Sequence, residues 1–207
     1  MAEHVATQRA FLDNELKPCL NAAVAGRGHV WFVDAAHGVY GTYLCGLWSI
    51  VRVFVRAASG RQRFDVLGAW DAVTRAFVSV TNTTVVNTDT MCELLQKIAA
   101  MGLAGPVTVV PDNARYQRNK VVQALAAELS ITLLYLPNYA PNLNLIERLW
   151  RFLKRKSVYG KYHPNFAAFR AAIEDTLTQL GTTHADALAS LMTLKFQELD
   201  SVSLLAA

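Results

Sequence analysis

The sequence predicts an α/β domain in which one mixed five-stranded sheet carries helices on both faces. Strand-like apolar segments come early in the chain, and helical and strand-like segments alternate after them. Strands joined by short turns pair antiparallel, whereas strands separated by a helix pair in parallel through right-handed crossovers. The 207 residues suffice for one well-buried domain, and 53% hydrophobic against 17% charged residues favours a packed core over disorder.

The first third of the chain predicts a helical segment or linker over residues 1–28 and then mainly strands. The helix covers about residues 5–25, with Pro18 as an expected interruption. An aromatic stretch over 40–48 predicts a loop or edge hairpin. The expected strands are 29–34, 51–56, 64–70 and 76–80, and the expected turns are 59–60 and 71–75.

The remaining chain predicts crossover helices and two further strands. Residues 131–136 are nearly all apolar, which is typical of a strand buried on both faces. The α/β domain is expected to span 29–180, followed by a C-terminal helical extension over 181–207. The expected helices are 87–101, 116–129, one from Asn144, 166–180 and 185–199, and the expected strands are 107–110 and 131–136.

Three acidic residues occur where these segments end or begin. Asp34 ends an apolar run and is expected at the tip of a central strand, and Asp112 follows the run that forms its parallel neighbour. Glu147 falls in the first turn of the helix that begins at Asn144. All three are therefore expected at one edge of the sheet, where ligand sites of such sheets lie.

This pattern suits the hydrolysis or transfer of phosphodiesters. Two divalent cations about 3.5–4 Å apart activate the nucleophile and stabilise the departing oxygen. Mg²⁺ prefers oxygen ligands and is usually held by a few carboxylates together with water and substrate phosphate. Asp34, Asp112 and Glu147 are therefore candidate metal ligands.

Each acid also has a purely structural explanation. Asp112 is a possible N-cap of the following helix. Asn144 with Glu147 three residues later matches a capping box, and Asp34 is a possible turn residue before Gly38. The placement of all three acids at one edge of the sheet favours the metal site.

Three sequence blocks resemble the catalytic blocks of bacterial insertion-sequence transposases, in particular the insertion-sequence six-thirty family of the mariner superfamily. The blocks are FVDAAH at 32–37, PDNARY at 111–116 and LPNYAPNLNLIERLW at 136–150. Between Asp112 and Glu147 lie 34 residues, which is the spacing of that family. The resemblance extends over about 29–180.

The resemblance implies a ribonuclease H-like catalytic domain that cleaves DNA at transposon ends and joins the freed end to target DNA, commonly at a TA dinucleotide. It implies that Asp34, Asp112 and Glu147 are catalytic and bind two Mg²⁺ ions, which Mn²⁺ can replace. Asn113 is expected to orient the second acid. Two alternatives stay open: a nuclease of the same fold without strand transfer, and a DNA-binding remnant that has lost catalysis. Gln117 stands where many relatives have histidine.

Basic residues indicate where DNA would lie. The net charge of +4 and the pI near 9.1 permit a polyanionic partner. Helical spacing places Arg151, Lys154 and Arg155 beside Glu147, and Arg148 follows the acid directly; these four are the expected DNA-binding residues, with a solvated charged face as the alternative. A second basic cluster and three aromatic or histidine residues have no assigned role: Arg52, Arg56, Arg61 and Arg63, with His37, Tyr43 and Trp48.

The expected partner is double-stranded DNA, both transposon ends and target. A homodimer on DNA is expected because two ends must be joined. Only 28 residues precede the first expected strand, whereas relatives carry helix-turn-helix modules there, so a separate N-terminal helix-turn-helix polypeptide is a further possible partner. No apolar run has the length of a membrane span or the pattern of a secretory signal. Three scattered cysteines suit reduced thiols. A cytoplasmic, nucleoid-associated protein without membrane contact is therefore expected.

Overall fold

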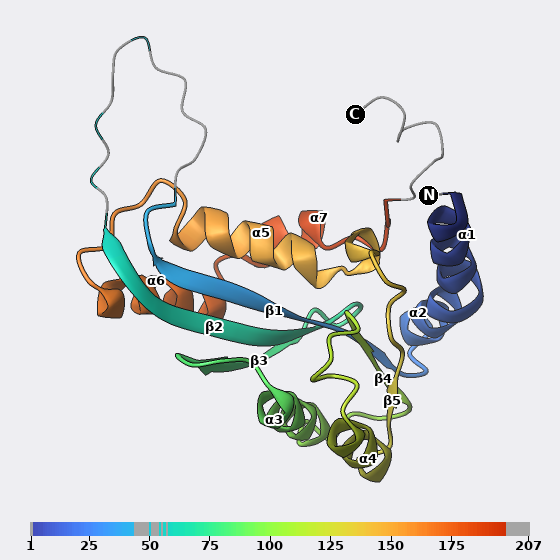
Figure 1. Cartoon of the computed structure of the whole chain (residues 1–207). Coiled ribbons are helices and arrows are strands. Elements are labelled where there is room, and N and C mark those ends of the chain that lie inside the picture. The colour runs from blue at the N-terminus through green and yellow to red at the C-terminus, as the bar shows by residue number, and fades with distance from the viewer. Residues whose placement is uncertain (1, 44–49, 51–53, 55, 57, 198–207) are drawn as a thin grey trace.

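The computed structural model describes residues 2–43, 50, 54, 56 and 58–197. Trp48, Arg52 and most of the expected strand 51–56 lie outside these residues. The helix expected over 185–199 is shorter: it ends at Leu191, and residues 192–197 are not helical. What is described forms a ribonuclease H-like sheet covered by helices on both faces (Figure 1).

The sheet has the strand order β3-β2-β1-β4-β5. The strands β1 and β2 pair antiparallel, as do β2 and β3, whereas β4 pairs in parallel with both β1 and β5. The expectation of a mixed five-stranded sheet is thereby confirmed. The strands are β1 His29–Gly41, β2 Ser59–Asp71, β3 Phe77–Asn82, β4 Val107–Pro111 and β5 Ile131–Leu133.

Alternating side chains of β1 enter two separate cores, because successive residues of a strand face opposite sides of the sheet. Val30 and Phe32 pack with the helices α5 and α6, and Trp31 and Val33 pack with α3 and α4. The helical elements are α1 Ala2–Phe11, a π-helical turn Leu12–Leu16, α2 Lys17–Val24, α3 Thr88–Ala99, α4 Lys120–Glu128, a 3-10 turn Pro141–Leu143, α5 Ile146–Ser157, α6 Phe166–Thr178 and α7 Ala185–Leu191.

Several boundaries differ from the sequence-based expectation. Pro18 does not interrupt the first helical segment, because a π-helical turn precedes it and the proline lies in the first turn of α2. Residues 59–60 begin β2 instead of forming a turn. The strand expected over 131–136 is wrong in length and place: β5 has three residues and lies at the sheet edge. The helix expected from residue 116 begins at Lys120, because Asn119 caps it.

Asp34 does not end its strand, contrary to expectation. The strand β1 continues to Gly41 because β2 pairs with it over almost its whole length. The parallel pairing with β4, however, stops at Val33 opposite Pro111. Asp34 is therefore the first residue of β1 beyond its parallel neighbour, and one side of the strand is open from this point.

Candidate active site

Two of the three acids follow the last residue pair of the parallel ladder. Val33 pairs with Pro111, so Asp34 and Asp112 are the next residues of the two adjacent strands. Asp112 Oδ1 accepts a hydrogen bond from the Ala114 backbone N–H at 3.3 Å. The N-cap of α4 is Asn119, so Asp112 is not the helix cap of the structural alternative.

The third acid comes from the first turn of α5. The residue preceding this helix is Leu145, and no side chain caps the helix. Asn144 instead donates from Nδ2 to the Val33 carbonyl at 3.3 Å, so the expected capping box with Glu147 does not form. This bond ties the start of α5 to the residue that precedes Asp34.

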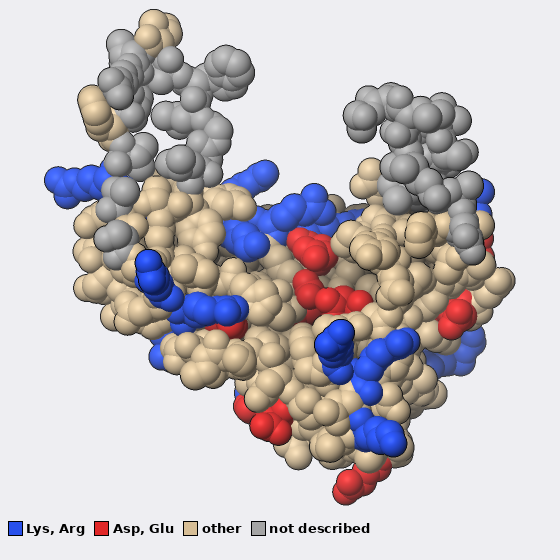
Figure 2. Space-filling view, viewed as in Figure 1, with Lys and Arg blue, Asp and Glu red and all other residues tan. Residues whose placement is uncertain are grey.

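Asp112 and Glu147 line one cavity of about 190 Å³, to which Asn144 also contributes. Figure 2 shows acidic side chains gathered in a hollow near the centre of the face in view, with basic side chains on both sides of it. Asp34 lies close enough to both other carboxylates for their charges to act on it. Burial first, and then the charges of Glu147 and Asp112, together raise the pKa of Asp34 to about 7.

The donor set fits a hard divalent cation in charge and in chemistry. Three carboxylates repel one another, and a bound cation removes that repulsion. Asn144 is buried, and within the described residues its Oδ1 has no hydrogen-bond partner. In the same part of the chain, however, no group of three or more His, Cys, Asp or Glu side chains is arranged around one ion position. The assignment of the three acids as metal ligands therefore stays a prediction.

The loop after β4 is held by two amide side chains. Asn113 has a positive φ of 81° and donates from Nδ2 to Asn138 Oδ1 at 2.9 Å, which joins this loop to the one after β5. Gln117 is fully buried; its Oε1 accepts the Ala114 N–H at 3.0 Å and its Nε2 donates to the Tyr116 hydroxyl at 3.2 Å. The backbone conformation of the segment that carries Asp112 is thus fixed.

Tyr116 and Gln117 were missed as site residues by sequence reasoning. Burial raises the pKa of the Tyr116 hydroxyl, and the nearby charges of Asp112 and Asp34 raise it further, so the phenol stays protonated beside the acids. Gln117 drew notice only as a departure from the family pattern, and nothing in one sequence shows that it is buried.

The four expected DNA-binding residues of α5 fall into three positions. Arg148 donates to the carbonyl oxygens of Leu191, Thr193 and Lys195, so its guanidinium lies against the segment after α7. Arg151 and Arg155 are exposed and line a groove of about 410 Å³ together with Lys195. Lys154 lines a separate pocket, to which His37 also contributes. A role in DNA binding stays a prediction for all four.

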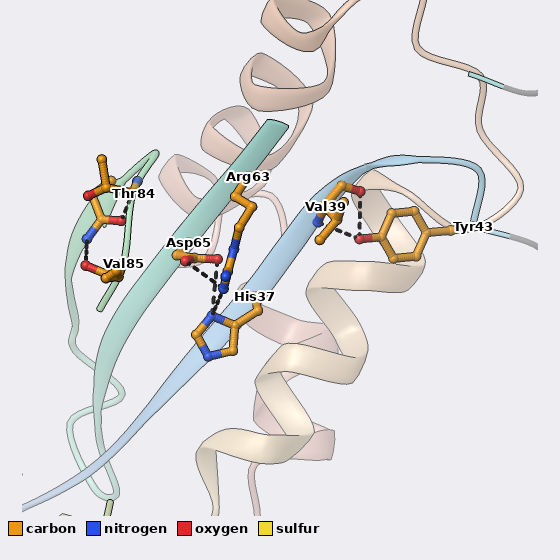
Figure 3. A network of polar contacts seen from close by, with 8 residues as sticks. His37, Val39, Tyr43, Arg63, Asp65, Thr84 and Val85 are labelled. Carbon is orange, nitrogen blue, oxygen red and sulfur yellow. Dashed lines mark hydrogen bonds and ion pairs between the residues drawn. The ribbon is translucent and has the colours of Figure 1, made fainter. Parts of the chain in front are cut away.

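His37 belongs to a network on the other face of the sheet (Figure 3). The buried Asp65 lies 3.1 Å from His37 Nδ1 and 3.2 Å from an Arg63 guanidinium nitrogen. The side chains of His37 and Arg63 are half exposed. Tyr43 bonds through its hydroxyl to the backbone of Val39, and its ring stacks on Phe169 with centroids 6.2 Å apart.

Residues 49–170 match the family described as DDE superfamily endonuclease, which is more than half of the chain. The chain belongs to this family of DDE endonucleases. The matched segment includes Asp112 and Glu147 and begins after Asp34. No curated protein matches the chain as a whole.

Solved structures similar to this DDE endonuclease share its ribonuclease H-like fold. The Mos1 strand transfer complex aligns with a TM-score of 0.62 at 14% identity, over 87% of this chain and 55% of that chain. The Mos1 transposase paired-end complex with left transposon end gives 0.57 at 12% identity, over 94% and 64%. The HTLV-2 integrase catalytic core domain in complex with magnesium gives 0.50 at 19% identity, over 75% and 87%. The chain thus spans between about half and two thirds of the Mos1 transposase chains.

Among the described residues, no helix is both long enough and apolar enough to cross a bilayer.

Proposed function

We propose that this DDE endonuclease is the catalytic domain of a DNA transposase that cleaves transposon ends and joins them to target DNA. The observation that carries the proposal is the convergence of Asp34, Asp112 and Glu147, from three distant segments, at the point where the parallel strands β1 and β4 separate. Membership of the insertion-sequence six-thirty family is part of the proposal. It is supported by the 34 residues between Asp112 and Glu147.

In this proposal Asp34, Asp112 and Glu147 hold two Mg²⁺ ions, which Mn²⁺ can replace. Such ions activate an attacking water or sugar hydroxyl and stabilise the departing oxygen. Asn113 holds the loop of Asp112 in place through Asn138. The exposed Arg151 and Arg155, with Lys154, bind backbone phosphates without reading sequence.

Arg148 has a different place in the proposal. Its bonds to the segment after α7 hold the first turn of α5, so in this proposal Arg148 supports the position of Glu147 more directly than it binds DNA.

The catalytic domain would extend over 29–180, with 1–28 and 181–207 as helical additions. The similar solved structures are assemblies: Mos1 transposase in a strand transfer complex and in a paired-end complex, and the HTLV-2 integrase catalytic core in a dimeric form.

By analogy, double-stranded DNA and a second copy of this chain are the proposed partners. A separate helix-turn-helix polypeptide is a further proposed partner for recognition of the ends. The proposed location is the cytoplasm, in association with the nucleoid.

A strand-transfer assay tests this function. The protein is incubated with MgCl₂, a labelled DNA fragment carrying the inverted repeats that border its gene, and a supercoiled target plasmid. Cleaved ends together with labelled plasmid are the expected result. Cleavage without labelled plasmid would point to a nuclease, and binding without cleavage would point to a remnant that has lost catalysis. Omitting the metal and adding EDTA is the matched control.

A further inference from the structure

One oxygen of Asp34 is held from outside the acidic cluster. Trp150 Nε1 donates a hydrogen bond to Asp34 Oδ2 at 3.1 Å, and Trp150 is buried. Trp150 follows Glu147 by three residues on α5, so both residues lie on the same side of that helix. The helix that presents the third acid therefore also fixes the first one.

The indole can reach Asp34 because the facing residue of β2 is a glycine. Gly68 pairs directly with Asp34 in the antiparallel ladder. A Cβ atom at Gly68 would lie 2.5 Å from Trp150 Cη2 and 2.8 Å from Phe77 Cε2. Phe77 also packs edge-on against Trp150, with ring centroids 6.2 Å apart. The indole thus lies over Gly68, with Asp34 and Phe77 as its neighbours, and any side chain at position 68 would displace it.

We infer that Trp150, seated on Gly68, is a positioning residue that fixes Asp34 Oδ2 and so orients this carboxylate to bind a divalent cation. This inference rests on the proposed function. The indole N–H is a neutral donor, so it orients the carboxylate without supplying a positive charge that would compete with the metal. Groups of this kind, bonded to a metal ligand, set ligand orientation and thereby metal affinity.

Another tryptophan allows packing to be separated from hydrogen bonding. Trp70 is buried in the same core as Trp150, but within the described residues its Nε1 has no hydrogen-bond partner. Trp70→Phe therefore removes a similar volume and no hydrogen bond, whereas Trp150→Phe removes the volume and the bond to Asp34. The pair is a matched set.

The first test measures Mn²⁺ binding to the DNA-free protein by electron paramagnetic resonance. We expect Trp150→Phe to weaken Mn²⁺ binding roughly ten-fold, as is usual for a partner of a metal ligand. Trp70→Phe should change it less than about two-fold, since no ligand contact is lost. Gly68→Ala should weaken it as Trp150→Phe does, because the methyl group displaces the indole. The cleavage rate of Trp150→Phe should recover at saturating Mn²⁺.

A second measurement needs no variant. Protein labelled with ¹⁵N-tryptophan contains four indole groups. Titration with Mg²⁺ should shift the Trp150 indole signal clearly more than that of Trp70. This result remains informative even where a substitution prevents folding.

Equal Mn²⁺ affinity of Trp150→Phe and the parent, or equal losses in Trp150→Phe and Trp70→Phe, would overturn the inference. So would an indole signal of Trp150 that ignores Mg²⁺. In these cases a parent that still binds metal and cleaves DNA keeps the proposed function intact. A parent that neither binds Mn²⁺ nor cleaves overturns both.

Discussion

Two carboxylates on the neighbouring strands β1 and β2 have opposite surroundings. Asp65 on β2 is buried and lies 3.2 Å from an Arg63 guanidinium nitrogen and 3.1 Å from His37 Nδ1. Asp34 on β1 is half-buried near two further acids, and its hydrogen bonds come from neutral donors, the Trp150 indole and the Ala35 backbone. Asp34 and His37 are three residues apart on one strand and so face opposite sides of the sheet.

The comparison distinguishes a carboxylate whose charge is neutralised by side chains of the protein from carboxylates whose charges are not. The charge of Asp65 is balanced by side chains of the same chain, which is what a structural carboxylate requires. Asp71 is a similar case, because it accepts N–H bonds from Val73 and Thr74 at 2.8 Å each and lies 2.9 Å from His29 Nδ1. The acids around Asp34 lack such balance, which supports the proposal that a divalent cation binds among them.

The largest expected effect comes from removing one acid of the unbalanced group. Asp112→Asn should lower DNA cleavage by about a thousand-fold or more, because metal-assisted charge stabilisation contributes several kcal/mol to the transition state. Its free energy of unfolding should stay the same or rise, since a repulsion is removed. A cleavage assay with labelled DNA, combined with urea unfolding, measures both.

Asp65→Asn is the control from the balanced group. It should leave metal binding nearly unchanged and lower the free energy of unfolding by about 1–3 kcal/mol, because the buried charge that pairs with Arg63 is lost. Should Asp112→Asn destabilise the fold as much as Asp65→Asn does, the two carboxylates would be structurally equivalent and the comparison would fail.

The next effect is on the pH dependence of stability. Burial and the neighbouring acids raise the pKa of Asp34 from 3.8 to about 7, so the folded protein favours the protonated acid. The resulting stabilisation is complete below about pH 4 and is lost as the pH rises through about 7, by at most about 4 kcal/mol. Urea unfolding between pH 4 and pH 8 should show this fall, and Asp34→Asn should remove it.

Divalent metal should reverse that loss. At pH 7.5 the acids are charged, so 10 mM MgCl₂ should raise the melting temperature by binding only the folded protein. At pH 5 the same addition should have little effect, because a proton occupies Asp34. A rise of equal size in Asp34→Asn would show that the metal binds elsewhere.

Much of the fold could be predicted from local patterns, and the failures have identifiable causes. The helix expected over 87–101 is found at 88–99 and the strand expected over 107–110 is found as β4, because apolar spacing is a local signal. The extension of β1 to Gly41 depends on pairing with β2, which no local pattern reports. The strand β5 was overestimated because an apolar run alone does not reveal an edge position.

In the candidate site, too, residues with a local sequence signal could be predicted, and contacts between distant segments could not. Asp34, Asp112 and Glu147 could be singled out because the first two end or follow an apolar run and the third falls at a helix start, each in a recognisable block, although Asp34 proved to lie within its strand. The contact between Trp150 and Asp34 could not, because the helical pattern marks Trp150 only as part of an apolar stripe. The role of Gly68 depends on a register across two strands. The contacts of Arg148 with the segment after α7 join residues more than forty positions apart.

The smallest expected effect concerns two arginines, one exposed in a groove and one paired with a carboxylate. Arg155 is exposed in the groove beside α7, whereas Arg63 is paired with Asp65. If Arg155 contacts a DNA phosphate, Arg155→Gln should weaken DNA binding equally for all sequences and reduce the slope of log affinity against log salt by about one. Arg63→Gln should leave that slope unchanged and lower stability instead, because its charge is already used within the protein. Fluorescence anisotropy with a duplex at several salt concentrations distinguishes the two, and a reduced slope for Arg63→Gln would extend the DNA-binding surface to the other face of the sheet.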